Sequence, residues 1–154
     1  MPLIRPALLL TLSAALLLPS PPADAQRAGN IGGCDIRRGT LCTNMNLNGA
    51  ELPGVNLANS QFTRSDLSGA NLRGATLNEA NFSQAEMAGA MLDEASMLRT
   101  NLRAAKLYGA AFVGANLQGA NFTRAQLVNA DLTGANLDQA IFLNAQTEGC
   151  KGCP

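Results

Sequence analysis

Large apolar residues return at every fifth position along most of this chain. The series runs from Leu47 to Phe142 without a slip, which makes twenty consecutive pentads. An amphipathic helix repeats its apolar face about every 3.6 residues and a strand about every 2, so neither explains a period of five. The pattern predicts a solenoid built from stacked repeats. The central apolar residues are Leu47, Leu52, Leu57, Phe62, Leu67, Leu72, Leu77, Phe82, Met87, Leu92, Met97, Leu102, Leu107, Phe112, Leu117, Phe122, Leu127, Leu132, Leu137 and Phe142.

A small residue stands two positions before each centre. It is Ala in fifteen of the twenty pentads. The exceptions are Met45, Val55, Ser60, Ser65 and Thr100. One Leu-class residue and one small residue in every five explain why 47% of the chain is apolar while only 4% is aromatic.

Single pentads resemble the motif A-(D/N)-L-x-x of the pentapeptide-repeat family. Examples are Ala70-Asn71-Leu72-Arg73-Gly74, Ala115-Asn116-Leu117-Gln118-Gly119 and Ala130-Asp131-Leu132-Thr133-Gly134. The resemblance implies an all-β fold, a right-handed quadrilateral β-helix with one pentad per side and about five coils of about twenty residues. It also implies that the central residue and the small residue point inward.

The phenylalanines support this coil length independently. Phe62, Phe82, Phe122 and Phe142 share one phase of a twenty-residue period, and Leu102 fills the gap. Equivalent residues of stacked coils lie about 4.8 Å apart, so we expect a ladder of rings inside one face.

Residues around the centre carry turn chemistry. Glycine often stands two positions after the centre, where a corner favours positive φ, as at Gly49, Gly54, Gly69, Gly74, Gly89, Gly109, Gly114, Gly119 and Gly134. Asparagine or aspartate often precedes the centre, as at Asn46, Asn81, Asn101, Asn121 and Asp131. We expect these polar side chains to bond nearby backbone or each other up the stack.

The first 25 residues have the layout of an export signal. Arg5 precedes an apolar run from Ala7 to Leu18, and Ala23-Asp24-Ala25 is an A-x-A cleavage site. The run is about a dozen residues long, whereas a membrane anchor needs about 20. The sequence predicts cleavage after Ala25, a periplasmic or secreted protein, and no membrane insertion afterwards.

The expected organisation has four parts. A signal peptide over 1–25 precedes an N-terminal cap over 26–44, a β-helix over 45–144 and a C-terminal cap over 145–154.

The four cysteines lie outside the repeat. Because a five-coil rod holds its ends farther apart than a disulfide can span, the pairs expected are Cys34–Cys42 and Cys150–Cys153. An exported chain would oxidise them, and we expect them to cap the two ends. The alternatives are a redox role for the C-x-x-C pair, or a zinc site completed by a partner chain.

The sequence argues against catalysis. It has no histidine, which removes Ser-His-Asp relays and most catalytic zinc sites. The neighbouring carboxylates Asp93 and Glu94 are interpreted as a solvated corner. We therefore expect no enzyme, no catalytic residue, no cofactor and no metal. Zero net charge gives no reason to expect a nucleic-acid partner.

Charge is unevenly divided among the four sides. Face one begins with the Leu47 pentad, face two with the Leu52 pentad, face three with the Leu57 pentad and face four with the Phe62 pentad. Faces one and two carry Glu51, Asp66, Glu86, Asp93, Glu94 and Asp131 against Arg73 and Lys106, a net of −4. Faces three and four carry Arg64, Arg99, Arg103 and Arg124 against Glu79 and Asp138, a net of +2. An evenly mixed, solvated surface is the equal alternative.

A candidate binding surface lies where faces one and two meet. Outward positions there are apolar over three coils and include the only tyrosine of the chain. Contiguous exposed apolar area is typical of a binding surface, although ordinary scatter is the alternative. We call these residues the apolar corner: Ala88, Met91, Tyr108, Ala111, Val113 and Val128.

These features favour a non-enzymatic periplasmic or secreted interaction module. Its partner is expected to be a protein or an envelope component, and the molecule itself a monomer or a side-by-side dimer. The family resemblance also implies an alternative, because some pentapeptide-repeat proteins imitate DNA and bind gyrase. Those imitators are acidic, intracellular dimers, whereas this chain is neutral and carries an export signal.

Overall fold

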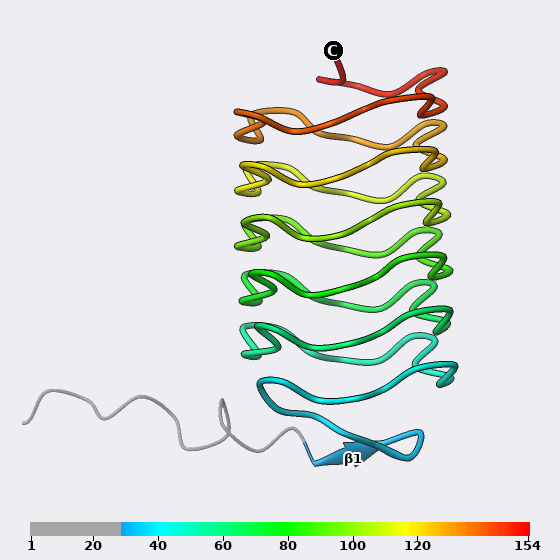
Figure 1. Cartoon of the computed structure of the whole chain (residues 1–154), viewed down its shortest axis with the longest axis vertical. Helices are drawn as coiled ribbons and strands as arrows, with labels where there is room; N and C mark the ends of the chain where they lie inside the picture. Colours follow the sequence, from blue (N-terminus) through cyan, green and yellow to red (C-terminus); the bar gives the residue numbers. More distant parts are fainter. Residues whose placement is uncertain (1–28) are drawn as a thin grey trace, which may run out of the picture.

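A computed structural model describes residues 29–154, and the predicted signal peptide lies outside the described residues. The chain forms a rod of stacked coils (Figure 1). A hairpin of strand β1 (Asn30–Ile31) and strand β2 (Cys34–Asp35), paired antiparallel, lies at the N-terminal end. The described part of the chain contains no helix long and apolar enough to span a bilayer.

Parallel bridges connect residues that are twenty positions apart. The first joins Leu41 to Gln61 and the last joins Asp131 to Lys151. This regular offset is the expected twenty-residue coil, and the fold is a right-handed quadrilateral β-helix. The bridges also extend past both ends of the expected 45–144 segment, so parts of the two flanking segments belong to the coils.

The backbone bonds repeat in the same way on each side. The N–H of a central residue donates to the next coil, as from Leu47 to the carbonyl of Asp66 at 2.7 Å. The N–H of the preceding residue donates to the previous coil, as from Asn71 to the carbonyl of Ala50 at 2.9 Å. The pentad period therefore satisfies the backbone coil by coil.

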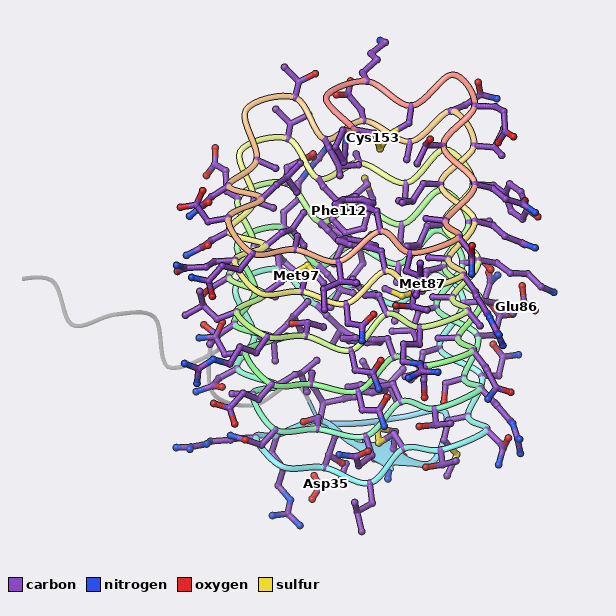
Figure 2. The ribbon with its side chains drawn as sticks, turned by 45° about the horizontal axis from the view of Figure 1, so that its top comes forward. Asp35, Glu86, Met87, Met97, Phe112 and Cys153 are labelled. Atoms are coloured by element: carbon purple, nitrogen blue, oxygen red, sulfur yellow. A yellow bond between two sulfur atoms is a disulfide. The ribbon has the colours of Figure 1, made fainter. Side chains whose placement is uncertain are left out.

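The central and small residues fill the interior, as predicted. Met87, Met97 and Phe112 lie between the walls in Figure 2, whereas Glu86 points outward. The exceptions to alanine include Ser60, Ser65 and Thr100, which are fully buried. Each of these hydroxyls donates to a carbonyl of the preceding coil, as from Thr100 to Leu77 at 2.9 Å. The buried polar groups are thus paired.

The expected phenylalanine ladder is present. Phe62 stacks on Phe82 with ring centroids 5.1 Å apart, and Phe122 stacks on Phe142 at 4.8 Å. Leu102 occupies the place between the two stacks and is also fully buried. The shared phase in the sequence therefore reports the coil length correctly.

Each corner is a tight turn with positive φ at the second residue after the centre. In the Leu107 turn, the N–H of Ala110 donates to the carbonyl of Leu107 at 3.1 Å, and Gly109 has φ 61°. A turn in which the third residue has positive φ and the second does not is a type II turn. Non-glycine residues adopt the same conformation, as at Arg64 (φ 58°) and Ala104 (φ 55°).

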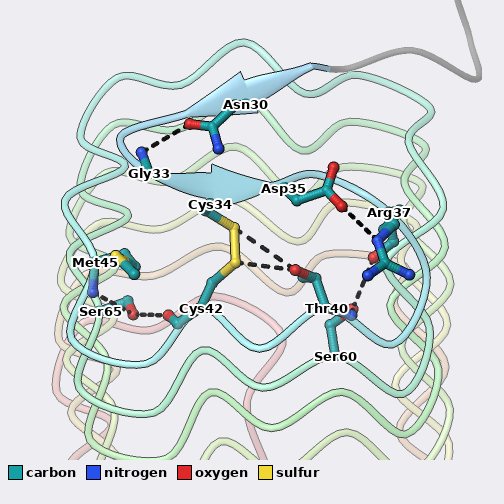
Figure 3. The surroundings of a disulfide bond; sticks show 10 residues. All are labelled: Asn30, Gly33, Cys34, Asp35, Arg37, Thr40, Cys42, Met45, Ser60 and Ser65. Carbon is teal, nitrogen blue, oxygen red and sulfur yellow. Dashed lines mark hydrogen bonds and ion pairs between the residues drawn. A yellow bond between two sulfur atoms is a disulfide. The ribbon is translucent and has the colours of Figure 1, made fainter.

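The two ends of the rod differ. At the N-terminal end, the Cys34–Cys42 disulfide lies under the β1–β2 hairpin, next to the hydroxyl of Thr40, and both cysteines are buried (Figure 3). The Cys150–Cys153 disulfide is also formed, with its Cα atoms 5.8 Å apart.

The second disulfide does not cover its end. The core side chains of the last coil, including Leu137 and Phe142, remain partly exposed, and the bridges continue through Lys151. Within the 145–154 segment, Ala145, Cys150 and Cys153 pack against the core and cover this end only in part. A loop of three residues is too short to lie across a whole coil.

Candidate functional site

Two columns of the apolar corner stack coil upon coil. Ala88, Tyr108 and Val128 follow one another, because Gly89 donates to the carbonyl of Tyr108 at 2.8 Å and the equivalent bond links the next coil. Met91 is bridged to Ala111 beside this column. Tyr108 is 41% exposed.

Val113, which was also predicted for this surface, does not lie where faces one and two meet, because it follows the central residue of face two and stacks between Asp93 and Thr133. It is 42% exposed and stands on the far side of the central residue Phe112, whose own side chain is buried. Its N–H donates to the Oδ1 of Asp93 at 3.2 Å, which fixes the turn. Five of the six predicted residues therefore lie where faces one and two meet, and Val113 lies across face two from them; Tyr108 and Val113 are the most exposed of the six.

Polar contacts border the apolar corner. The Tyr108 hydroxyl donates to the Oε1 of Gln126. Lys106 Nζ lies 2.5 Å from Glu86 Oε1, and this hydrogen bond raises the pKa of Lys106. Beyond Ala111, the hydrogen bond from the Thr133 side chain lowers the pKa of Asp131. The border groups already hold partners within the protein.

The sides of the rod differ in their ion pairs. On faces one and two every described cation has a carboxylate partner: Arg73–Asp93 at 2.8 Å, Lys106–Glu86 at 2.5 Å and Lys151–Asp131 at 3.7 Å. Among residues 29–154, the four arginines of faces three and four form no ion pair: Arg64, Arg99, Arg103 and Arg124. Arg64 instead donates to the Oε1 of Gln84 at 3.1 Å.

The residues before the centres bond as expected. Their side-chain oxygens accept backbone N–H groups two residues later, as from Ser68 to Asp66 at 2.9 Å. On face four the amides also bond between coils, from Asn81 to Gln61 at 3.0 Å and from Asn101 to Asn81 at 3.1 Å. These columns stabilise the coils and need no ligand.

A groove of about 380 Å³ on face three was not foreseen from the sequence. It forms where Gly119 leaves space beside the side chain of Arg99. Asn78 is fixed in its wall by accepting the N–H of Leu98 at 3.0 Å. The groove offers one carboxylate, one guanidinium and several amides, and its residues are Asn78, Glu79, Leu98, Arg99, Gln118, Gly119 and Gln139.

Groups capable of chemistry do not converge in the described residues. Asp93 is engaged by Arg73 and by the N–H of Val113, while Glu94 stands at a corner with φ 58°. Within residues 29–154, no group of three metal-ligating side chains lies close enough together to hold an ion. The C-x-x-C cysteines are joined in a disulfide.

Comparisons with solved structures return repeat proteins of the same kind. A pentapeptide-repeat protein from the thylakoid lumen of Arabidopsis thaliana is 34% identical, with 55% of this chain and 59% of that chain covered and a TM-score of 0.54. The match thus spans less than two thirds of that protein. HetL, a pentapeptide-repeat protein involved in heterocyst differentiation regulation in Nostoc sp. strain PCC 7120, is 18% identical, with 81% and 90% covered and a TM-score of 0.45.

A third solved structure is QnrB1, a plasmid-mediated fluoroquinolone resistance protein. It is 25% identical, with 71% of this chain and 62% of that chain covered and a TM-score of 0.32. No curated protein matches the sequence. The family model for pentapeptide repeats matches with 8 copies, over residues 40–79, 70–107, 80–119 and 105–144. Since these matches span more than half of its length, the chain belongs to the pentapeptide-repeat family.

Proposed function

We propose that this protein is exported and acts as a non-enzymatic, rigid interaction module that binds a protein of the cell envelope through its apolar corner. The observation that carries the proposal is the pair of exposed side chains Tyr108 and Val113 on adjoining sides of a filled rod. With the core closed to ligands, recognition must take place on the outer sides.

The physical character of the corner supports this role. Tyrosine provides a large, stiff contact surface with a polar tip, and such residues dominate protein interfaces. The coils beneath are tied by a bond in each turn and by bonds to both neighbouring coils. A partner therefore meets a surface that is already ordered, which lowers the entropy cost of binding.

A non-catalytic role is supported by the absence of histidine from the sequence and by the separation of reactive groups in the described residues. The groove on face three has neither a nucleophile paired with a base nor two carboxylates facing each other. Gyrase binding by DNA imitation requires an acidic surface. The zero net charge argues against it, as do the arginines of faces three and four, which form no ion pair within residues 29–154.

The proposal is tested by the double variant Tyr108→Asp with Val113→Asp. Both side chains are more than two fifths exposed, so the fold should persist while two charges enter the apolar corner. Crosslinking in the native envelope, followed by identification of the attached protein, should recover a specific partner with the native chain and at least tenfold less with the variant.

The matched control is Leu41→Asp with Thr43→Asp on face four. It adds the same charge to two exposed residues far from the corner, so it should retain the partner. Equal recovery by the native chain and both variants would show that the apolar corner is not the binding surface. Protein that stays in the cytoplasm with residues 1–25 attached would refute export.

A further inference from the structure

We propose that face four of the rod docks on an anionic lipid surface, lying flat on the headgroups without spanning the bilayer. This inference goes beyond the proposed function, because it concerns a different side of the rod from the apolar corner and a lipid surface in place of a protein. It does not depend on which protein the apolar corner binds.

The first evidence is the charge of face four. This side contains three arginines and no lysine, aspartate or glutamate. Each of the other three sides carries at least two carboxylates, such as Glu79 and Asp138 on face three. The zero net charge of the chain therefore conceals one side with a charge of +3, and a local field of this kind attracts an anionic partner. The residues of face four are 40–44, 60–64, 80–84, 100–104, 120–124 and 140–144.

The three arginines are available to an anionic ligand. Arg64, Arg103 and Arg124 are exposed and form no ion pair within residues 29–154. Arg64 donates to a neutral amide, the Oε1 of Gln84, at 3.1 Å. A guanidinium without a carboxylate partner can donate two parallel hydrogen bonds to a phosphate, and it is more weakly hydrated than an ammonium. The phosphate of a lipid headgroup is a ligand of this kind.

Carboxylates at the borders of face four are already engaged or balanced. On face one, Asp66 accepts the backbone N–H of Ser68 at 2.9 Å, and Glu86 Oε1 lies 2.5 Å from Lys106 Nζ. At the corner between faces three and four, the charge of Glu79 is matched by that of a neighbouring arginine, Arg99. The borders therefore reduce the positive charge of face four without cancelling it.

Face four is also flat and stiff. Parallel bridges join Gln61 to Asn81 and Asn81 to Asn101, with neighbouring coils about 4.8 Å apart. The amide side chains bond along the same row, from Asn81 to Gln61 at 3.0 Å and from Asn101 to Asn81 at 3.1 Å. Arg64 and Arg124 stand three coils apart, or about 14 Å. The face therefore presents its arginines in one plane, to several headgroups of a planar layer at once.

Apolar side chains favour a lipid surface over a soluble polyanion. Leu41, Ile141 and Leu143 occupy outward positions at the two ends of face four, and they are 77%, 48% and 62% exposed. A hydrated polysaccharide or nucleic acid has little use for such side chains. Peripheral lipid binding combines basic residues that hold the headgroups with apolar residues that reach the acyl boundary. Face four carries both kinds and no opposing charge.

The test is co-sedimentation with vesicles, on protein produced from the full chain and processed by the cell. The probe vesicles contain phosphatidylglycerol and phosphatidylcholine in about equal parts, and the reference vesicles contain phosphatidylcholine alone. We expect binding to the anionic vesicles and at least tenfold weaker binding to the neutral ones. Raising sodium chloride from about 50 mM to about 500 mM should release the protein, because salt screens the attraction.

A pair of variants locates the binding on face four. Each basic residue near an anionic surface strengthens binding about fivefold, so Arg103→Gln with Arg124→Gln should weaken it about 25-fold. The matched control is Arg73→Gln with Lys151→Gln, which removes two charges from exposed side chains of the opposite side, face two. This control should bind the anionic vesicles as tightly as the native protein does.

Absence of binding to the anionic vesicles would overturn the inference, and so would equal weakening in the two double variants. Binding to heparin without binding to vesicles would also overturn it, because face four would then be a site for a soluble polyanion. Tyr108→Asp with Val113→Asp should still bind vesicles after losing the protein partner, whereas Arg103→Gln with Arg124→Gln should keep that partner. Failure of this inference and failure of the proposed function are therefore distinguishable.

Discussion

Positive φ at every corner shows what a single residue does in this fold. Gly109 and Gly114 were predictable, because glycine favours that conformation and recurs at that place. Ala104 and Arg64 adopt the same φ although nothing in their side chains favours it. The stacked coils above and below impose the turn on them, so only the period of the sequence could indicate it.

The inward-facing hydroxyls give a second lesson at this scale. Ser60, Ser65 and Thr100 interrupt the alanine column in the sequence and read there only as exceptions. In the structure each donates to a carbonyl that the coil leaves within reach. The accepting carbonyl belongs to the preceding coil, so its position depends on how that coil folds. The conformational preference of a single serine or threonine does not predict it.

Asp66 should make stability depend on acidity. Its pKa is lowered from 3.8, mainly because the backbone N–H of Ser68 donates to it. A lowered folded pKa stabilises the fold fully above the unfolded value and progressively less as the pH falls through the folded value. We expect unfolding to become easier below about pH 4, and Asp66→Asn, which keeps the accepting oxygen, to reduce that loss.

Urea unfolding of the native protein and of Asp66→Asn, between about pH 2 and about pH 7, measures how the free energy of unfolding depends on pH. Asn71 and Asn116 accept the same turn N–H elsewhere, so the variant should keep the local geometry at neutral pH. An identical acid dependence in the two proteins would contradict the assigned cause.

At the scale of elements, the disulfide pairs at the two ends of the rod were predictable from the sequence, whereas their burial was not. The disulfide pairs followed from the length of the rod, because the two ends are too far apart to be bridged. Whether a disulfide is covered depends on the backbone that lies over it, and within residues 29–154 a hairpin lies beside Cys34 and none beside Cys150. Burial at the ends is a tertiary property that the cysteine spacing does not encode.

The two disulfides should therefore contribute unequally. Their sequence separations are 8 and 3 residues, and the chain-entropy relation gives about 2.5 kcal/mol for the first and about 1.6 kcal/mol for the second. Replacing Cys34 and Cys42 by alanine also leaves a cavity in a buried site, which adds to the loss. Replacing Cys150 and Cys153 by alanine leaves no such buried gap.

Chemical denaturation of the two double variants measures the difference. The N-terminal variant should lose more free energy of unfolding, and mild reductant should open Cys150–Cys153 first, because that pair is partly exposed. Equal losses, or earlier reduction of Cys34–Cys42, would mean that the hairpin does not shield its disulfide.

The whole molecule is a filled rod whose sides differ. The period of five predicted a solenoid, and the family resemblance implied the quadrilateral β-helix. The sorting of side chains by face assigned Tyr108 to an exposed column but put Val113 at the wrong corner of face two. The pairing of every described cation on faces one and two was not predictable, because it depends on rotamers of neighbouring coils. The groove beside Arg99 was not predicted, because its lining residues come from four successive coils and its shape depends on how their side chains are arranged.

Site-specific photo-crosslinking in the native envelope tests the central claim most directly. A photoreactive phenylalanine derivative at Tyr108 keeps the ring in place, and the same residue at Thr43 on face four is the matched control. The account predicts a discrete protein adduct from position 108 in the exported fraction and none from position 43. The same adducts from both positions, or none from position 108, would contradict it.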